Sequence, residues 1–348
     1  MKLIDRCSHA SVPGRARRLL LVVLAALASA VAASPAGAAG HARHAAKSKA
    51  KPIPNVGIVD IYTKLGYQQS TAAGTGMILT RSGEVLTNNH VIRGATTFRV
   101  VDVTTHRKYT ATVVGYSVSR DVAVLQLQHA SRLKTIPLGN SGMVRRGQRV
   151  VARGNALGRG GVPRVSVGRV TALNRQIVAR DDSGNSETLT NLIETSARVV
   201  PGDSGGPLEN LRGRAIGMIT AGSTGGARRG YAIPITRALS LARQIVAGAT
   251  NHVIHVGATA FLGVSLSDAA GGGGAQIQGI VTGSAAEAAG LAAGDVITSL
   301  NGTTISSSAD VQLAVLGLTP GTAVPIGWTD SAGTAQTGTI TPASGPPQ

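Results

Sequence analysis

Three polar residues of this sequence, His90, Asp121 and Ser204, have types and settings that suit nucleophilic catalysis. Ser204 lies in PGDSGGPL (201–208), where three glycines and two prolines predict a tight turn that exposes the hydroxyl group. A serine hydroxyl is a weak nucleophile, so it needs a base and an acid that orients the base. His90 in TNNHVI and Asp121 in SRDVAVLQL, each beside a strand-like run, are the candidates for these roles. Together the three residues indicate acyl-transfer chemistry at a carbonyl carbon.

The order of the three residues along the chain favours one arrangement of this chemistry. His, Asp, Ser within one strand-rich region is the order of chymotrypsin-type triads, whereas subtilisin-type and α/β-hydrolase triads follow other orders. In that arrangement His90 accepts the proton of Ser204, and Asp121 holds the imidazole tautomer. The turn Gly202, Asp203 and Ser204 then forms the oxyanion hole, with the Gly202 and Ser204 N–H groups as its donors. This mechanism uses no metal and no cofactor.

Each of these residues, taken singly, also has an ordinary structural interpretation. A histidine at a strand end is usually a surface or core residue, and an aspartate before an apolar run usually starts a strand. A GDSGG turn by itself can be only a loop. The joint occurrence of three such motifs in this order, inside one region, makes coincidence improbable.

Short strand-like runs surround the candidate residues. Between residues 53 and 249 they recur about every ten residues, for example GMILT, EVLTN and RAIGMIT, and predict an all-β sandwich or a pair of barrels. Aromatic residues make up only 2% of the chain, so the core must consist of Val, Ile, Leu and Ala. One helix is expected to close this domain over ITRALSLARQIVAG (235–248), with Thr236 as its N-cap. Its apolar face is expected to contain Ile235, Leu239, Ala242 and Val246.

A second, smaller unit follows a short linker (250–256). Residues 257–345 contain FLGVSLSD near their start, a glycine run (271–274), and SSSADVQLAVLGL, in which Ser307 and Asp310 have the spacing of a capping box. This pattern indicates a small mixed α/β domain. The charge distribution marks the same division, because residues 244–348 contain no Lys or Arg although the whole chain carries a formal net charge of +18.

The first forty residues have the features of an export signal. Basic residues precede the apolar run LLLVVLAALASAVAA (19–33), which small residues follow. The segment is either a cleaved signal peptide or an N-terminal anchor, and the basic, Pro-containing residues 41–52 are expected to form a flexible linker. The only cysteine, Cys7, precedes the apolar run, so cleavage would leave a chain without thiols. We therefore expect an exported protein that is secreted, periplasmic or associated with the cell envelope.

The basic excess of residues 41–243 has two interpretations. It suggests weak attraction to anionic polymers or membranes of the envelope, whereas the simpler interpretation is a solvated, Arg-rich surface. The scarcity of aromatic residues beside the arginines argues against base stacking, so no specific nucleic-acid partner is expected.

Several motifs together resemble a known family. GTGMIL, TNNHVI, RDVAVLQL, PGDSGGPL and YAIPI resemble the protease domain of the HtrA/DegP (high-temperature-requirement) serine proteases. GSAAEAAGLAAGDVITSLNG resembles the core of the PDZ domain that follows it in that family. The resemblance covers residues 53–345 and implies a trypsin-like double β-barrel (53–249) followed by a small α/β PDZ domain (257–345). It further implies a serine endopeptidase that acts outside the cytoplasm on unfolded or damaged polypeptides, without a cofactor, and that forms homo-oligomers such as trimers.

The resemblance also assigns binding residues and shows two departures from the family. It implies a loop for peptide C-terminal carboxylates at Phe261, Leu262, Gly263 and Val264, and substrate-binding residues at Val199, Thr220, Ala221 and Gly222. The family often has an apolar residue where this chain has Gly222, and Val199 favours a pocket for small aliphatic side chains. The family usually has Asn before the nucleophile, whereas this chain has Asp203, for which Arg198 is our candidate partner.

Three functions fit these patterns. The first is an exported serine endopeptidase whose PDZ domain binds peptide C-termini. The second is a proteolytically silent chaperone or peptide-binding protein on the same scaffold, with a collapsed oxyanion loop. The third is an adhesin whose basic barrel binds anionic envelope polymer. The complete set of His90, Asp121 and Ser204 favours the first.

Overall fold

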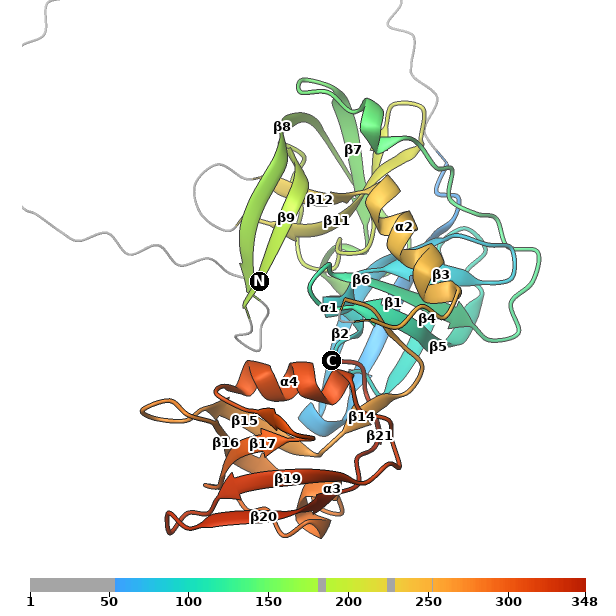
Figure 1. Ribbon diagram of the computed structural model, residues 1–348. Helices are drawn as coiled ribbons and strands as arrows, with labels where there is room; N and C mark the ends of the chain where they lie inside the picture. Colours follow the sequence, from blue (N-terminus) through green and yellow to red (C-terminus); the bar gives the residue numbers. More distant parts are fainter. Residues whose placement is uncertain (1–53, 181–185, 224–228, 252) are drawn as a thin grey trace, which may run out of the picture. The chain divides into compact units, whose positions relative to one another are not determined.

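The structure, a computed structural model, describes residues 54–180, 186–223, 229–251 and 253–348 (Figure 1). The predicted signal segment (1–40) and linker (41–52) lie outside the described residues. Among the described residues, no helix is both long enough and apolar enough to cross a membrane.

Six strands in the first half of the chain form one barrel. Their order is β5-β4-β1-β2-β3-β6, and β5 also pairs with β6, which closes the sheet on itself. Strand β4 alternates exposed and buried residues, as expected where one face covers a core. The strands are β1 (Ile58–Leu65), β2 (Ser70–Ile78), β3 (Glu84–Thr87), β4 (Thr97–Asp102), β5 (Lys108–Ser117) and β6 (Val122–Leu127), with α1 (Asn89–Ile92) and η1 (Gly66–Gln68) between them.

Six further strands form a second closed barrel in the order β10-β11-β12-β9-β8-β7. Its longest hairpin joins β8 and β9 (Figure 1). The strands are β7 (Arg149–Gly154), β8 (Arg164–Arg180), β9 (Ser186–Thr195), β10 (Pro207–Asn210), β11 (Ala215–Gly222) and β12 (Gly230–Pro234), and the short helices η2 (Ser141–Met143) and η3 (Ala156–Gly158) flank β7.

The expected closing helix is present as α2 (Ile235–Val246), but two details of its prediction were wrong. Its N-cap position is Pro234, and Thr236 lies inside the first turn, where its hydroxyl bonds to Ser141. Val246 is 45% exposed, and Ile245 is the buried residue of the last turn. The cores contain mainly Val, Ile, Leu and Ala, as the composition requires.

The C-terminal unit is a small α/β domain with its own core, which confirms the predicted fold class. Its main sheet has the order β15-β16-β17-β19-β20, so β15 is an edge strand. One half of the predicted capping box is present, because the Ser307 hydroxyl accepts the Asp310 N–H at 3.3 Å, whereas the Asp310 carboxylate accepts the Ser306 N–H at 2.9 Å. The elements are β14 (Thr259–Phe261), β15 (Val264–Asp268), β16 (Ala275–Ile280), α3 (Ala285–Ala288), β17 (Val296–Leu300), β18 (Thr303–Thr304), α4 (Ser308–Leu316), β19 (Val324–Thr329), β20 (Ala335–Ile340) and β21 (Ala343–Gly345). The short strand β13 (His255–Val256), which precedes this unit, pairs with β5 of the first barrel.

Candidate active site

His90 and Asp121 lie in direct contact in the first barrel. His90 is in α1, which follows β3, and Asp121 immediately precedes β6, the strand that pairs with β3. The His90 Nδ1 atom lies 3.0 Å from each carboxylate oxygen of Asp121, and the His90 main-chain N–H donates to Asp121 Oδ1 at 3.1 Å. Asp121 therefore fixes both the ring and the backbone of the histidine. Nδ1 carries the proton in this arrangement, because a carboxylate only accepts, and Nε2 is left as the basic nitrogen.

Two further residues hold Asp121 in place. The carboxylate is buried, with 1% of the residue exposed, and its Oδ2 atom accepts a hydrogen bond from the Thr220 hydroxyl. The Asn88 side chain donates to the Asp121 carbonyl at 2.9 Å. Asp121 also has a left-handed φ of 51°, so these contacts maintain an uncommon backbone conformation. Sequence reasoning missed Asn88 and gave Thr220 only a substrate-binding role.

Ser204 comes from the second barrel, in the turn between β9 and β10. Its carbonyl accepts the Thr75 N–H of β2 at 2.8 Å, which ties the nucleophile to the barrel that carries His90. The Ser204 hydroxyl donates to the Thr220 carbonyl at 3.3 Å. Transfer of its proton to His90 therefore requires the hydroxyl group to turn away from the Thr220 carbonyl, and catalytic hydrogen bonds often form only in the substrate complex.

The turn before Ser204 has a backbone conformation that only glycine adopts easily. Gly202 has φ +90°, and a Cβ atom on it would lie 2.1 Å from the Asn155 carbonyl oxygen. The Pro201 carbonyl accepts the Leu157 N–H at 2.7 Å. Because a trans peptide is planar, this bond turns the Gly202 N–H in the opposite direction, away from Leu157.

Among the described residues, the N–H groups of Gly202 and Ser204 have no hydrogen-bond acceptor. The Asp203 N–H, in contrast, donates to the Val200 carbonyl at 3.1 Å. The donors of an oxyanion hole must be free until charge develops on the substrate. Gly202 and Ser204 meet this requirement. Asp203 does not supply a free N–H group, and its side chain stabilises the turn instead.

Thr75 connects the two barrels at this turn. Its hydroxyl donates to the Gly202 carbonyl at 2.7 Å and accepts the Asn155 N–H at 2.8 Å, in addition to its main-chain bond to Ser204. A single residue of the first barrel thus bonds to both ends of the candidate oxyanion turn.

The partner of Asp203 is Arg164, not Arg198 as the sequence suggested. The Asp203 carboxylate is buried and accepts Arg164 Nη1 at 3.2 Å and the Val200 N–H at 3.0 Å. Arg164 Nη1 also donates to the Arg198 carbonyl at 3.0 Å. Burial raises the pKa of Asp203 above its ordinary value of 3.8, and the Val200 N–H and Arg164 oppose this rise. One guanidinium therefore holds the segment before the nucleophile at two points.

Replacing Arg164 by glutamine should lower the free energy of unfolding by about 2 kcal/mol, because a buried carboxylate loses its cationic partner. It should also lower kcat, since the turn that carries Gly202 loses its anchor. Asp203→Asn in the same chain should restore both quantities, because the amide needs no counter-ion. Urea unfolding and peptide cleavage of the two single variants and the double variant measure the coupling. If the effects of the two single substitutions added up in the double variant, the Arg164–Asp203 pair would not position the turn that carries Gly202.

Of the candidate substrate-binding residues, Thr220 contacts Ser204 directly through its carbonyl. Val199 faces two glycines: a Cβ atom on Gly222 would lie 2.8 Å from the Val199 carbonyl oxygen, and one on Gly230 would lie 2.6 Å from Val199 Cγ2. Thr220 and Ala221 are buried in β11, and the Thr220 hydroxyl is occupied by Asp121. Close packing therefore explains Gly222, where a larger residue would displace Val199.

The predicted carboxylate loop, Phe261 to Val264, is shaped by one glycine and two main-chain hydrogen bonds. Gly263 has φ +82°, and a Cβ atom there would lie 2.2 Å from Ser284 Cβ. The carbonyls of Leu262 and Gly263 accept the N–H groups of Ala286 and Val281, which turns these carbonyls toward the domain. The loop leads into the edge strand β15, and Ser308 at the start of α4 donates to Asp268 at the other end of β15. An extended peptide can add to β15 with its carboxylate at the loop.

Gly263→Ala should weaken the binding of a peptide with a free C-terminus by about tenfold, because the clash with Ser284 moves the N–H donors. Fluorescence polarisation of a labelled peptide measures the effect. Gly271→Ala is the matched control, since Gly271 has φ +89° in the same domain but a Cβ atom on it would have no neighbour within 4 Å. Equal losses in the two variants would contradict the assignment of this loop.

A closed double barrel with a His–Asp pair on one barrel and a glycine-framed serine on the other defines a trypsin-like peptidase domain, here followed by a PDZ domain. Comparison with known families agrees: the trypsin-like peptidase domain matches residues 74–218, and the PDZ domain matches residues 260–329. In this order of domains the chain is similar to serine proteases of the HtrA/DegP type.

Individual relatives support this assignment. The chain is 33% identical to the serine protease PepD of Mycobacterium tuberculosis, over 84% of this chain and 64% of that protein. It is 36% identical to the periplasmic pH-dependent serine endoprotease DegQ of Escherichia coli, over 73% of this chain and 56% of that protein. The chain thus spans a little over half the length of these relatives. The solved structure of the HtrA-type protease AlgW with a tripeptide covers 85% of this chain, with 96% of its own chain aligned, 26% identity and a TM-score of 0.50.

Proposed function

We propose that this protein is an exported serine endopeptidase that hydrolyses unfolded or damaged polypeptides through His90, Asp121 and Ser204. The observation that carries the proposal is the contact of His90 Nδ1 with both oxygens of the buried Asp121, beside a serine turn in which two N–H groups have no acceptor among the described residues. The related periplasmic endoproteases support both the activity and the export.

The residues perform the reaction in two steps. In acylation, His90 Nε2 removes the proton from Ser204 Oγ as the oxygen attacks the substrate carbonyl, and then donates that proton to the leaving amine. In deacylation, the same nitrogen takes a proton from a water molecule that attacks the acyl carbon, and it returns this proton to Ser204 Oγ as the new C-terminus leaves. Asp121 stabilises the imidazolium in both steps, while the Gly202 and Ser204 N–H groups bind the negative oxygen.

The PDZ domain is proposed to bind the C-termini of substrates through its carboxylate loop and β15. This strand has a free edge in its sheet, so a peptide can extend the sheet by main-chain hydrogen bonds. We further propose that the protein acts as a homo-oligomer, as the family resemblance implies, which light scattering of the purified chain would test.

A silent peptide-binding protein is the second candidate, and one observation favours it. The Ser204 hydroxyl bonds to the Thr220 carbonyl, so the nucleophile is not yet bonded to its base among the described contacts. If that orientation persisted with substrate present, the triad would be complete in residues but inactive.

Labelling with a fluorophosphonate probe distinguishes these functions, because the probe reacts only with an activated serine. The proposed peptidase should become labelled and should cleave unfolded casein, and Ser204→Ala should abolish both. A folded chain that neither reacts nor cleaves, even with a C-terminal peptide added, would establish the silent binding protein instead.

A further inference from the structure

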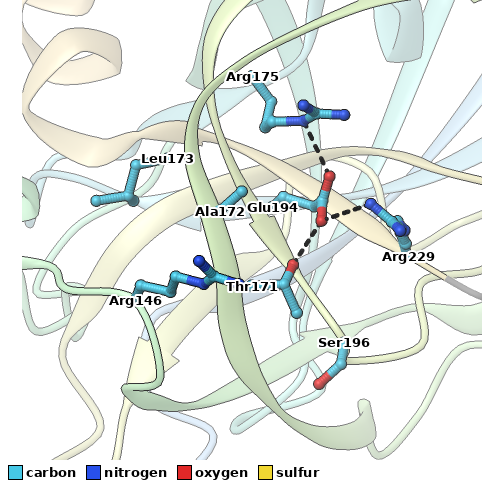
Figure 2. Close-up of a pocket in the computed structure, with 8 residues that line it drawn as sticks. All are labelled: Arg146, Thr171, Ala172, Leu173, Arg175, Glu194, Ser196 and Arg229. Carbon is cyan, nitrogen blue, oxygen red and sulfur yellow. Dashed lines mark hydrogen bonds and ion pairs between the residues drawn. The ribbon is translucent and has the colours of Figure 1, made fainter.

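A polar pocket of about 580 Å³ lies on the second barrel and contains none of the triad residues. Figure 2 shows Glu194 at its centre, with the side chains of three arginines around it. We call it the Glu194 pocket. It is lined by Arg146, Thr171, Ala172, Leu173, Arg175, Glu194, Ser196 and Arg229.

Three neighbours hold the Glu194 carboxylate. Its carboxylate accepts the Thr171 hydroxyl at 2.7 Å and Arg229 Nη1 at 2.9 Å, and it forms an ion pair with Arg175 Nε at 3.1 Å. Burial by itself would raise the pKa of Glu194, but the Thr171 and Arg229 hydrogen bonds and the two guanidinium charges outweigh it and lower the pKa. The residue therefore stays ionised and fixes two of the arginines in the pocket wall.

The pocket nevertheless has a surplus of two positive charges, because three guanidinium groups face one carboxylate. Arg146, which extends from the loop before β7 toward Thr171, forms no hydrogen bond or ion pair with any described residue (Figure 2). The side chains of Arg175 and Arg229 are 48% and 45% exposed, so their remaining N–H groups face solvent. Each guanidinium has five donors, and the contacts with Glu194 use only a few of them.

We propose that the Glu194 pocket binds a phosphate group. Arginine forks match the oxygens of phosphate in a bidentate manner, and a doubly charged phosphate balances the surplus of two positive charges. The pocket exceeds the size of one phosphate, and Ala172 with Leu173 forms an apolar wall beside the arginines. The ligand is therefore a phosphate-bearing molecule that supplies two negative charges, either a free pyrophosphate-like compound or a phosphodiester polymer with two adjacent, singly charged phosphates in the pocket.

Ligand binding in this pocket would affect the candidate active site by way of Arg229. The Arg229 N–H donates to the Ser223 hydroxyl, and the Ser223 N–H donates to the Arg229 carbonyl, both at 2.9 Å. Ser223 directly follows Gly222, the candidate substrate-binding residue at the end of β11. A phosphate that holds the Arg229 side chain would therefore act on a residue whose main chain bonds to Ser223, next to the strand end at which substrate is proposed to dock. This coupling rests on the proposed peptidase function, whereas phosphate binding does not.

Isothermal titration of the full-length chain carrying Ser204→Ala tests the binding, with pyrophosphate in one arm and poly(glycerol phosphate) in the other, at constant ionic strength. Arg146→Gln should weaken binding by about tenfold, as expected for loss of a charge-assisted contact. Arg212→Gln is the matched control, because Arg212 is an exposed arginine of the same barrel outside the pocket. The arm that binds more tightly identifies the source of the phosphate.

Equal binding by the Arg146 and Arg212 variants would overturn the site and show only general attraction to a basic surface. Tighter binding of an acidic peptide of matched charge would overturn the assignment to phosphate. In the active chain, saturating pyrophosphate should change KM for a peptide substrate, and Arg146→Gln should remove that change. Phosphate binding with an unchanged KM would overturn only the link between the pocket and the active site. Absence of any cleavage would refute the peptidase function, but it would not affect the titration result.

Discussion

Replacing Asp121 by asparagine should lower kcat for peptide cleavage by about 10⁴-fold while the protein stays folded. The carboxylate accepts hydrogen bonds from both the ring Nδ1–H and the main-chain N–H of His90. An asparagine side chain that presents its NH₂ group to the ring would place the imidazole proton on Nε2. That nitrogen could then no longer accept the proton of Ser204. Cleavage assays with a fluorogenic peptide and with casein measure the decrease in kcat.

Asp102→Asn is the matched control for this experiment. Asp102 is also buried in the first barrel, where its carboxylate accepts hydrogen bonds from Thr104 and Thr105. Its replacement should alter stability but leave kcat near the wild-type value. If Asp121→Asn cleaved as fast as Asp102→Asn, the proposed role of Asp121 in catalysis would be wrong.

Gly202→Ala should lower kcat by about 10²- to 10³-fold, the usual effect of losing one oxyanion donor. An alanine at φ +90° is strained, and its Cβ would lie 2.1 Å from the Asn155 carbonyl oxygen, so the peptide must rotate and redirect its N–H. The KM should change less, because ground-state binding of the substrate does not depend on this donor.

Gly147→Ala separates backbone strain from loss of the donor. Gly147 has φ +85° in the loop before β7 of the same barrel, and a Cβ atom there has nothing within 4 Å. The control should therefore lose some stability and keep its kcat. An unchanged kcat in Gly202→Ala, with Ser204 labelling intact, would mean that other groups bind the oxyanion.

The sequence was sufficient to predict the contact of His90 with Asp121, because each lies next to a recognisable strand and the motif order implies one arrangement. It was not sufficient for the Arg164–Asp203 pair. That contact depends on the pairing of Gly154 with Arg164 between β7 and β8, and on Gly154 packing directly against Asp203. Arg198 was nearer in sequence, but the structure uses its carbonyl rather than its guanidinium.

The Glu194 pocket was also hidden in the sequence. NRQIVAR (174–180) contains charged residues that do not suggest a strand, yet β8 continues through it because β9 supplies main-chain partners along the same length. The long hairpin places Arg175 opposite residue 192 and brings it to Glu194. The pairing of β8 with β9 determines the position of Arg175, and the residues around Arg175 in the sequence do not predict that pairing.

Because of Thr75, the geometry of the candidate active site depends on how the two barrels pack against each other. This residue belongs to the first barrel, but it bonds to Gly202 and Ser204 of the second and to the loop that starts at Asn155. A small sliding of one barrel on the other would therefore disturb the oxyanion turn before it disturbed either hydrophobic core. A molecule that wedges between the barrels could then silence the enzyme without touching the triad, and such inhibition would not be relieved by raising the substrate concentration.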